Sequence, residues 1–261
     1  MSKKAIVVVS FGTSYEEAEK AICNIEEKIR EAFKDYDFFR AFTSGVIIRK
    51  LKKTKNIVIE NPEELICRLE KEGYEEVICQ PTHIINGDEY DKMCYMLARH
   101  EDSFQSLKVG KPLLTYLEDF KSCVPIILDM VEKLKDQEAL LLMGHGSVHF
   151  ANSAYCQMET IFRCEGHDNV YIGTVEGFPE IEYVMKQLKR DNIKKVYLAP
   201  FMIVAGDHAR NDLAGEEEDS WKSILEKAGY ETETILKGMG EIDEIANIFV
   251  EHAKEAEELE A

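Results

Sequence analysis

The chain contains an internal repeat, and this repeat limits the fold more than any other feature of the sequence. Residues 76–90 read EVICQPTHIINGDEY and residues 195–209 read KVYLAPFMIVAGDHA, so in both an apolar run ends in Pro and is followed by Gly-Asp. Two further pairs of segments match in the same order, IVVVSFGTS (6–14) with LLLMGHGSV (140–148) and AFTSG (41–45) with GTVEG (173–177). The repeat predicts two halves of similar fold.

Short β-branched runs alternate with amphipathic segments along almost the whole chain. The predicted strands are 5–9, 37–42, 77–81, 108–114, 139–143, 169–174, 195–200 and 230–236. This alternation is typical of parallel sheets covered by helices on both faces. Runs such as AIVVV and ALLLM are apolar throughout, which indicates burial on both sides. We therefore predict an α/β fold of two Rossmann-like domains, each a four-stranded parallel sheet flanked by helices, with the active-site cleft between them.

The helical segment 116–136, which contains Pro125, is the predicted link between the halves. We place the boundary near residue 125, which gives domains of residues 1–125 and 126–261 and leaves open that the C-terminal helix packs back on the first half. Matched positions are not evenly separated along the chain. The first half carries about a dozen additional residues before its third loop, and we expect them in a surface loop within 52–65.

Three loop positions differ in chemistry between the halves. The first half has Phe11, Ser44 and Glu89 where the second half has His145, Glu176 and His208. Ligands of parallel sheets bind outside the carboxyl ends of the strands, and each residue of the second set follows a predicted strand. Two imidazoles and a carboxylate suit a divalent transition metal with open coordination positions. Glu176 could instead cap the helix that begins near Pro179.

Three other polar residues have possible roles near these loops, and for two of them, His83 and Glu89, there are two alternatives. His83 lies in the third loop of the first half, where it either faces the cleft or is a hydrogen-bonded core histidine. Glu89 either accepts a proton or simply begins a helix. Asp207 could orient the neighbouring His208 imidazole.

Composition excludes several classes of function. The formal net charge of −18 argues against a nucleic-acid partner, since an acidic surface repels phosphate. No apolar run approaches the ~20 residues of a membrane span. The seven cysteines are scattered without a Cys-x-x-Cys pair, which favours reduced thiols and the cytoplasm. The phosphate-binding motifs of ATP and dinucleotide sites are absent, so no nucleotide is expected.

A series of motifs resembles one family over nearly the whole chain. In order, these are SFGTS, FRAFTSGVIIRKL, HIINGDEY, MGHGS, VEGFPE, AGDHARNDLAGEEEDSW and GMGE. Together they are similar to the anaerobic-type sirohydrochlorin cobaltochelatases, class II tetrapyrrole chelatases related to ferrochelatase. The resemblance implies a lyase that inserts Co²⁺ into sirohydrochlorin without ATP, early in anaerobic cobalamin biosynthesis. It also implies that His145, Glu176 and His208 form the metal site.

Within this resemblance, His145 and Glu89 are the expected catalytic residues, with the macrocycle as substrate and no permanent cofactor. Insertion of Fe²⁺ or Ni²⁺ into the same ring remains an alternative, because histidine and glutamate ligands do not select sharply among these ions. A non-catalytic metal or tetrapyrrole carrier is a second alternative, and a metabolic α/β protein with incidental histidines is a third. The sequence leaves a homo-oligomer open. Sirohydrochlorin carries eight carboxylates, so local cations must outweigh the acidic field, and the candidates are Arg49, Lys50 and Arg210.

Overall fold

The computed structural model describes residues 2–259, which form two compact units. One unit contains the residues up to Thr115 together with those from Gly240 onward, and the other is Tyr116–Met239. The division precedes the boundary predicted near residue 125, because helix α5 (Leu117–Leu128) packs against α6 (Ser153–Cys164) of the second unit. The C-terminal helix α9 (Asp243–Lys254) groups with the first unit, where it packs on α1 (Glu16–Ala32).

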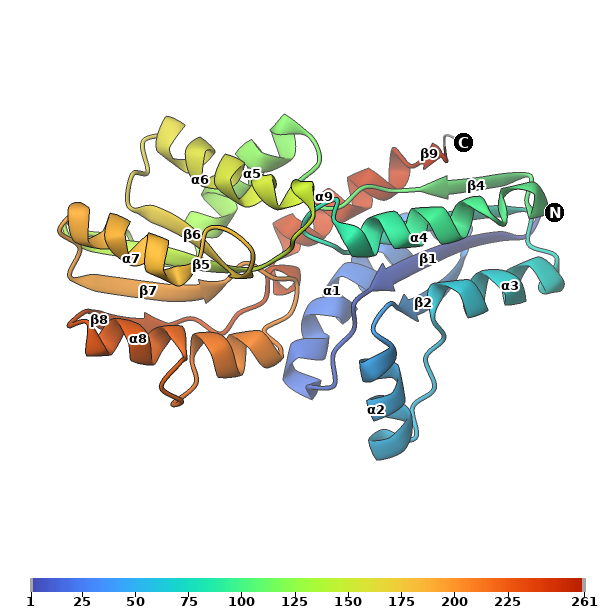
Figure 1. Cartoon of the computed structure of the whole chain (residues 1–261). Coiled ribbons are helices and arrows are strands. Elements are labelled where there is room, and N and C mark those ends of the chain that lie inside the picture. The colour runs from blue at the N-terminus through green and yellow to red at the C-terminus, as the bar shows by residue number, and fades with distance from the viewer. Residues whose placement is uncertain (1, 260–261) are drawn as a thin grey trace. The chain divides into compact units, whose positions relative to one another are not determined.

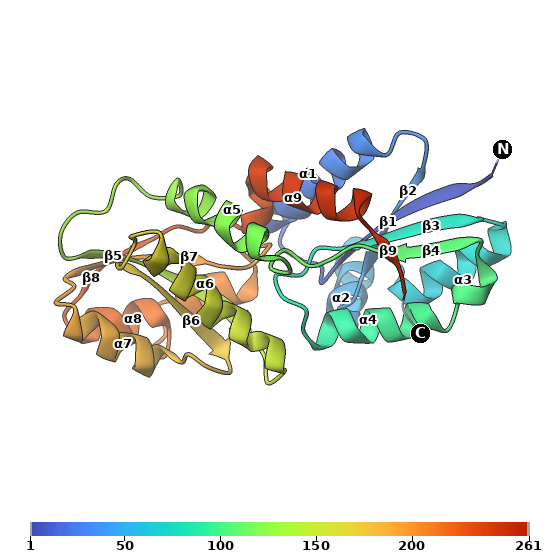
Figure 2. The ribbon, with the colours of Figure 1, turned by 90° about the horizontal axis from the view of Figure 1, so that it is seen from above.

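The first unit is built on a five-stranded sheet in the order β2-β1-β3-β4-β9 (Figure 1). Its strands are β1 (Lys4–Ser10), β2 (Asp37–Phe42), β3 (Glu76–Pro81), β4 (Ser106–Val109) and β9 (Glu257–Glu258). Its remaining helices are α2 (Gly45–Lys55), α3 (Pro62–Glu72) and α4 (Asp88–Ala98). Viewed from above, α1 and α9 cover one face of the sheet, and α3 and α4 cover the other (Figure 2).

The second unit has a four-stranded parallel sheet in the order β6-β5-β7-β8. Its strands are β5 (Glu138–Gly146), β6 (Val170–Glu176), β7 (Lys195–Pro200) and β8 (Glu231–Thr234). Helices α7 (Ile181–Arg190) and α8 (Trp221–Lys227) pack on one face around the buried Trp221.

The two sheets confirm the internal repeat. The order β2-β1-β3-β4 in the first unit matches β6-β5-β7-β8 in the second, and all the pairings within these sets are parallel. The predicted α/β class and flanking helices are therefore confirmed. The first sheet has one additional strand, β9, which is antiparallel and lies at the sheet edge. It consists of two exposed glutamates, so the sequence has no apolar alternation there that would predict a strand.

The first unit also has one helix more than the repeat requires. Two helices, α2 and α3, connect β2 to β3, whereas α7 alone connects β6 to β7. The additional residues thus begin at Gly45 and form a helix, where the sequence predicts a loop within 52–65. Helix α2 buries only Leu51.

Apolar strand residues form the core of each unit. In the first unit, alternate β1 residues such as Val7 contact α3 and α4 through buried side chains that include Leu65 and Leu97.

Asn61 begins α3 with reciprocal hydrogen bonds to Glu64, which satisfies backbone donors at that end of the helix. Among residues 2–259, no helix is long and apolar enough to cross a membrane.

Candidate active site

His145 is the second-to-last residue of β5, with a glycine on either side. A β-carbon on Gly144 would overlap the Tyr155 ring. One on Gly146, whose φ is +80°, would overlap the Glu176 carbonyl oxygen. Glycine at both positions therefore lets β5 end this close to its neighbours. The imidazole is half-buried, and its Nδ1 lies 3.0 Å from the Gly146 carbonyl oxygen.

His208 lies in the loop after β7, directly before a π-helix, Ala209–Leu213. Its Nδ1 is 2.5 Å from a carboxylate oxygen of Asp212, four residues further on. The sequence suggested the neighbouring Asp207 as the orienting carboxylate. Asp212 makes this contact instead, because the helical backbone brings a residue four positions later to the same side. The spacing His-x-x-x-Asp was the available signal for this partner.

In both histidines Nδ1 makes the hydrogen bond described above, which leaves Nε2 as the nitrogen for a ligand. A carbonyl or carboxylate oxygen accepts the hydrogen bond at Nδ1 in each case, so Nδ1 carries a proton, and in the neutral imidazole the lone pair is then on Nε2. The rings meet edge to face, with centroids 4.8 Å apart and planes at 90°. The structure therefore brings together two oriented imidazoles, each with a nitrogen that can bind a metal ion or accept a proton.

Glu176 lies on the adjacent strand but outside this pair. It is the last residue of β6, its backbone pairs with Gly146, and its side chain is exposed. It does not cap the next helix, because Glu180 occupies the N-cap position of α7. Within residues 2–259, no three His, Cys, Asp or Glu side chains are grouped closely enough to hold a metal ion. The structure thus pairs the histidines and places the predicted third ligand beside them without joining it to them.

Asn152 holds together the two loops that follow β5 and β6. Its Oδ1 accepts a hydrogen bond from the Ser147 amide at 2.9 Å, and its Nδ2 donates to the Phe178 carbonyl oxygen at 2.5 Å. A β-carbon on Gly177 would lie 2.7 Å from the Ser147 carbonyl oxygen, so the loops approach each other closely. This contact connects the segment after His145 to the segment after Glu176, although the sequence contained no motif that indicated it.

The matched positions in the first unit have other roles. Phe11 is 50% exposed at the end of β1, and Ser44 accepts a hydrogen bond from the Ile47 amide to cap α2. Glu89 lies in the first turn of α4, where its partly exposed carboxylate is 3.8 Å from the Lys92 ammonium group. It borders a cavity of about 220 Å³ that Thr43 also lines.

His83 is half-buried, and its ring is not hydrogen-bonded. Neither of its ring nitrogens is exposed, and neither has a partner within residues 2–259. Burial lowers the pKa of His83 to about 4, although the nearby Glu89 carboxylate acts in the opposite direction. The prediction that His83 is a hydrogen-bonded core residue is therefore wrong. Two ring nitrogens that are shielded from water and unpaired lower the stability of the folded state.

The three cations that were predicted to offset the acidic field of the protein lie in different units. Arg49 and Lys50 are exposed on α2 of the first unit. Arg210 is half-buried in the second unit, two residues after His208, and its Nε donates to the Ala205 carbonyl oxygen at 3.3 Å. Arg210 thus lies next to the paired histidines in the sequence, with part of its donor capacity already used.

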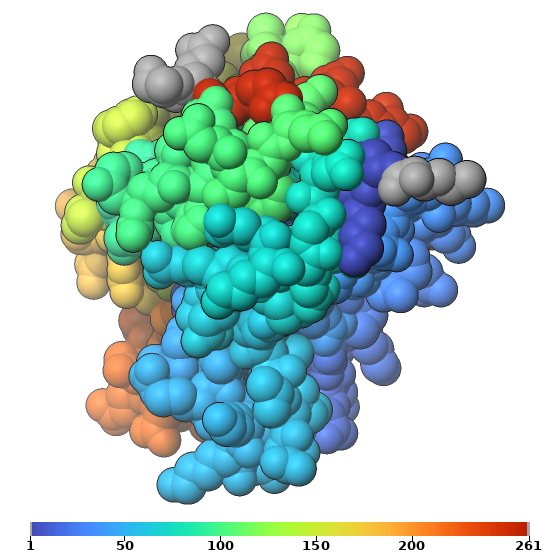
Figure 3. All heavy atoms as spheres, turned by 90° about the vertical axis from the view of Figure 1, so that its right-hand side faces the viewer, coloured from blue at the N-terminus to red at the C-terminus, as the bar shows by residue number. Residues whose placement is uncertain are grey.

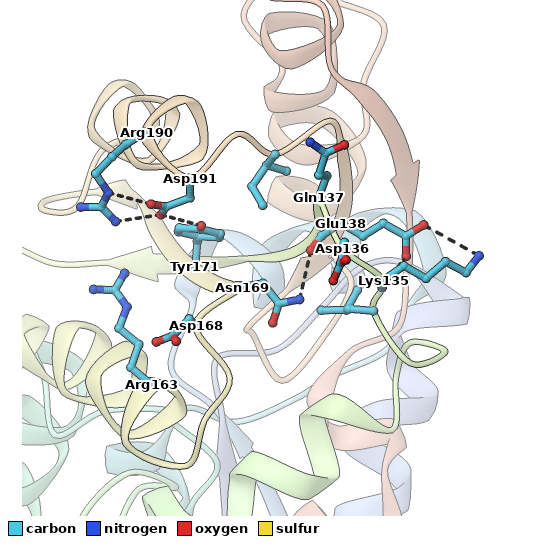
Figure 4. Close-up of a pocket in the computed structure, with 12 residues that line it drawn as sticks. Lys135, Asp136, Gln137, Glu138, Arg163, Asp168, Asn169, Tyr171, Arg190 and Asp191 are labelled. Atoms are coloured by element: carbon cyan, nitrogen blue, oxygen red, sulfur yellow. Dashed lines mark hydrogen bonds and ion pairs between the residues drawn. The ribbon is translucent and has the colours of Figure 1, made fainter.

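A further cavity lies at the other end of the second sheet. It has a volume of about 630 Å³, and its lining includes Glu138, the first residue of β5, and Asn169, which directly precedes β6 (Figure 4). Its polar groups largely bond to each other. Arg190 pairs with Asp191, which also accepts a hydrogen bond from Tyr171 (Figure 4). Because the histidines lie at the carboxyl ends of strands of this sheet, this cavity is separate from them.

Comparisons with known proteins give a consistent assignment. The model of the cobalt chelatase (CbiK) family matches residues 4–258. The sirohydrochlorin cobaltochelatase of Salmonella typhimurium is 38% identical over 255 residues, which cover 97% of this chain and 96% of that protein. The sirohydrochlorin cobaltochelatase CbiKC of Nitratidesulfovibrio vulgaris is 31% identical over 97% of this chain and 90% of its own length. SirB from Bacillus subtilis with Fe³⁺ shares the fold, with a TM-score of 0.65 and 14% identity over 97% of this chain and 95% of SirB. The chain belongs to the cobalt chelatase family.

Proposed function

We propose that the chain inserts Co²⁺ into sirohydrochlorin and releases two protons, without ATP, as a cytoplasmic enzyme of cobalamin biosynthesis. The observation that carries this proposal is the pair of imidazoles, His145 and His208, with both Nδ1 atoms engaged and both Nε2 lone pairs available. The names of the two family members above supply the substrate and the metal.

The residue types suit delivery of a metal rather than its storage. Neutral imidazole binds Co²⁺ well and still exchanges, whereas a set of thiolates would retain the ion. In the proposed arrangement His145, His208 and Glu176 hold the ion before transfer. Glu176 must turn toward the histidines to do so, which its exposed position at the end of β6 allows.

The reaction also requires proton acceptors. Two pyrrole N–H protons leave the ring while four ring nitrogens replace the ligands of the ion. When the ion has passed to the ring, the Nε2 lone pair of His145 is free to accept one proton. Glu89, a partly exposed carboxylate at the start of α4, is the proposed acceptor for the second proton.

The test is turnover by the metal-free protein with sirohydrochlorin and Co²⁺, followed by the absorbance change of the macrocycle. We expect His145→Ala and His208→Ala to lower kcat/KM by at least about 100-fold, since each removes a metal ligand or base. His167→Ala, at the amino edge of the second sheet, is the matched control and keeps wild-type turnover.

Parallel assays with Fe²⁺ and Ni²⁺ test the metal. A higher kcat/KM with either ion than with Co²⁺ would reassign the enzyme to that ion. A carrier, in contrast, would bind the macrocycle stoichiometrically, and product in excess of the enzyme excludes it.

A further inference from the structure

We propose that helix α2 of the first unit binds the carboxylates of the substrate and draws a polycarboxylate ring to this acidic protein. The inference rests on the proposed function, because it takes the macrocycle as the ligand. It assigns a role to the helix that the internal repeat does not account for.

Helix α2 concentrates positive charge in a chain that is otherwise acidic. Residues 45–59 contain five of the 32 lysines and arginines and none of the 50 acidic residues. Four of these cations, Arg49, Lys50, Lys52 and Lys53, are exposed. Only Lys55 forms an ion pair within the described chain, with Glu16 at 2.9 Å. The Lys50 ammonium group lies 5.5 Å from the centre of the Tyr15 ring, and the other three exposed cations have no ion pair in the described chain. These four cations are therefore not neutralised by a carboxylate, in a protein with a formal net charge of −18.

Helix α2 contributes little to the hydrophobic core of its unit. Only Leu51 is buried, and Val46 is 64% exposed. In Figure 1 the helix extends away from the sheet of its own unit, and in Figure 3 the atoms in the same blue lie at the lower edge of the view. The second unit connects the equivalent strands, β6 and β7, with one helix, so the fold closes without a counterpart of α2. An exposed helix that the fold does not require is well suited to contact a ligand.

The position of α2 in its unit also fits. Ser44, which caps α2, follows β2 at the carboxyl edge of the sheet, the edge where parallel sheets bind ligands. The Ser44 amide donates to the Phe11 carbonyl oxygen at 3.2 Å, which places the start of α2 beside the half-exposed Phe11. Arg49 folds back over Gly45, with Nη1 3.1 Å from the position of a β-carbon there. Arg49 therefore lies over the first residue of α2, and the residue before it is hydrogen-bonded to the backbone of the exposed Phe11.

This combination matches the chemistry of the ligand. The ring of sirohydrochlorin is flat and apolar, and its acetate and propionate groups lie at the rim. An aromatic side chain suits the ring, and flexible lysines and an arginine suit carboxylates. Exposed cations also increase the rate of encounter with an anionic ligand, an effect that salt screens.

The test measures binding of metal-free sirohydrochlorin by fluorescence, so that it does not depend on turnover. The variant carries Arg49→Gln, Lys50→Gln, Lys52→Gln and Lys53→Gln. The control carries Lys71→Gln, Lys133→Gln, Lys189→Gln and Lys227→Gln, which changes the net charge by the same amount at exposed positions elsewhere. Each protein is titrated at low and at high ionic strength, and also with a porphyrin that has only two carboxylates.

We expect the α2 variant to bind sirohydrochlorin about tenfold more weakly at low ionic strength, with the difference shrinking at high salt. The control and the binding of the dicarboxylate porphyrin should change less than about twofold. If the control binds equally weakly, the effect comes from net charge. If the α2 variant binds as tightly as the wild type, the helix does not take part in binding. Either result overturns the inference. A wild-type protein that binds the ring through α2 but does not insert metal would instead overturn the proposed function alone.

Discussion

Asp212 accepts a hydrogen bond from Nδ1 of His208 at 2.5 Å, and His208 directly precedes the π-helix that contains Asp212. The carboxylate keeps a proton on Nδ1 and fixes the orientation of an imidazole that meets the ring of His145 edge to face. Carboxylates that orient metal-binding imidazoles in this way also increase the basicity of the nitrogen that binds the metal. The histidine and its orienting group therefore form one functional unit, and both belong to the same short segment of chain.

We predict that Asp212→Asn lowers kcat/KM for cobalt insertion by about 10- to 100-fold, the range typical of orienting partners. An amide can still accept from Nδ1, but it lacks the charge that stabilises the donor. The comparison is Asp207→Asn, the neighbour that the sequence suggested. Measured Co²⁺ affinity and turnover should fall more in the first variant, and a larger loss in the second would restore the sequence-based assignment.

Gly146 should tolerate no side chain. Its φ of +80° disfavours alanine, and the new β-carbon would also overlap the Glu176 carbonyl oxygen on the paired strand. Gly166 offers a matched control, because it has a similar φ of +87° with no atom within 4 Å of the added carbon. We expect Gly146→Ala to lower the free energy of unfolding by more than about 3 kcal/mol, and Gly166→Ala by about 1 kcal/mol. Urea unfolding followed by the fluorescence of the single tryptophan, Trp221, measures both; similar losses would mean that β5 shifts to admit the side chain.

The sequence was sufficient to predict most of the fold because the repeat and the strand pattern agree. Apolar runs identified the eight parallel strands, and the strand-end rule selected His145 and His208, which the structure does pair. The end of β4 was misplaced. Gly110 and Pro112 follow Val109, and the chain leaves the sheet there because proline cannot donate to a ladder.

Contacts made by single side chains could not be predicted. Nothing in the order of residues indicates that Asn152 joins two loops, because both partners are backbone groups and Phe178 lies 26 residues away. The absence of hydrogen bonds to the His83 ring could not be predicted for a similar reason, since the hydrogen bonding of an imidazole inside the fold depends on neighbours from other segments. The additional helix α2 was detected only as a difference in spacing, which gives the size of an insertion but not its conformation.

Asn152→Ala should impair activity more than stability. The change removes hydrogen bonds to the Ser147 amide and the Phe178 carbonyl oxygen, so the loops after His145 and Glu176 lose their connection. Asn169 makes a related contact at the opposite edge of the same sheet, where its Nδ2 donates to the Glu138 carbonyl oxygen at 3.1 Å. Both alanine variants should lose about 1 kcal/mol of stability. Turnover should fall severalfold for Asn152→Ala alone, and an equal fall in both variants would indicate a general effect of destabilisation.

Replacement of His83 should remove part of the acid sensitivity of the first unit. Burial lowers its pKa to about 4, below the value near 6.5 expected in the unfolded chain. The unfolded state therefore binds more protons between these values, and stability falls as the pH decreases from about 6.5 toward about 4. At about pH 5 this group alone costs about 2 kcal/mol relative to neutral pH. Hydrogen exchange of the β3 amides at both pH values measures the difference. His83→Leu and His83→Gln should both lose this contribution, since neither residue titrates, whereas an unchanged pH dependence would show that the imidazole is protonated to the same extent in both states.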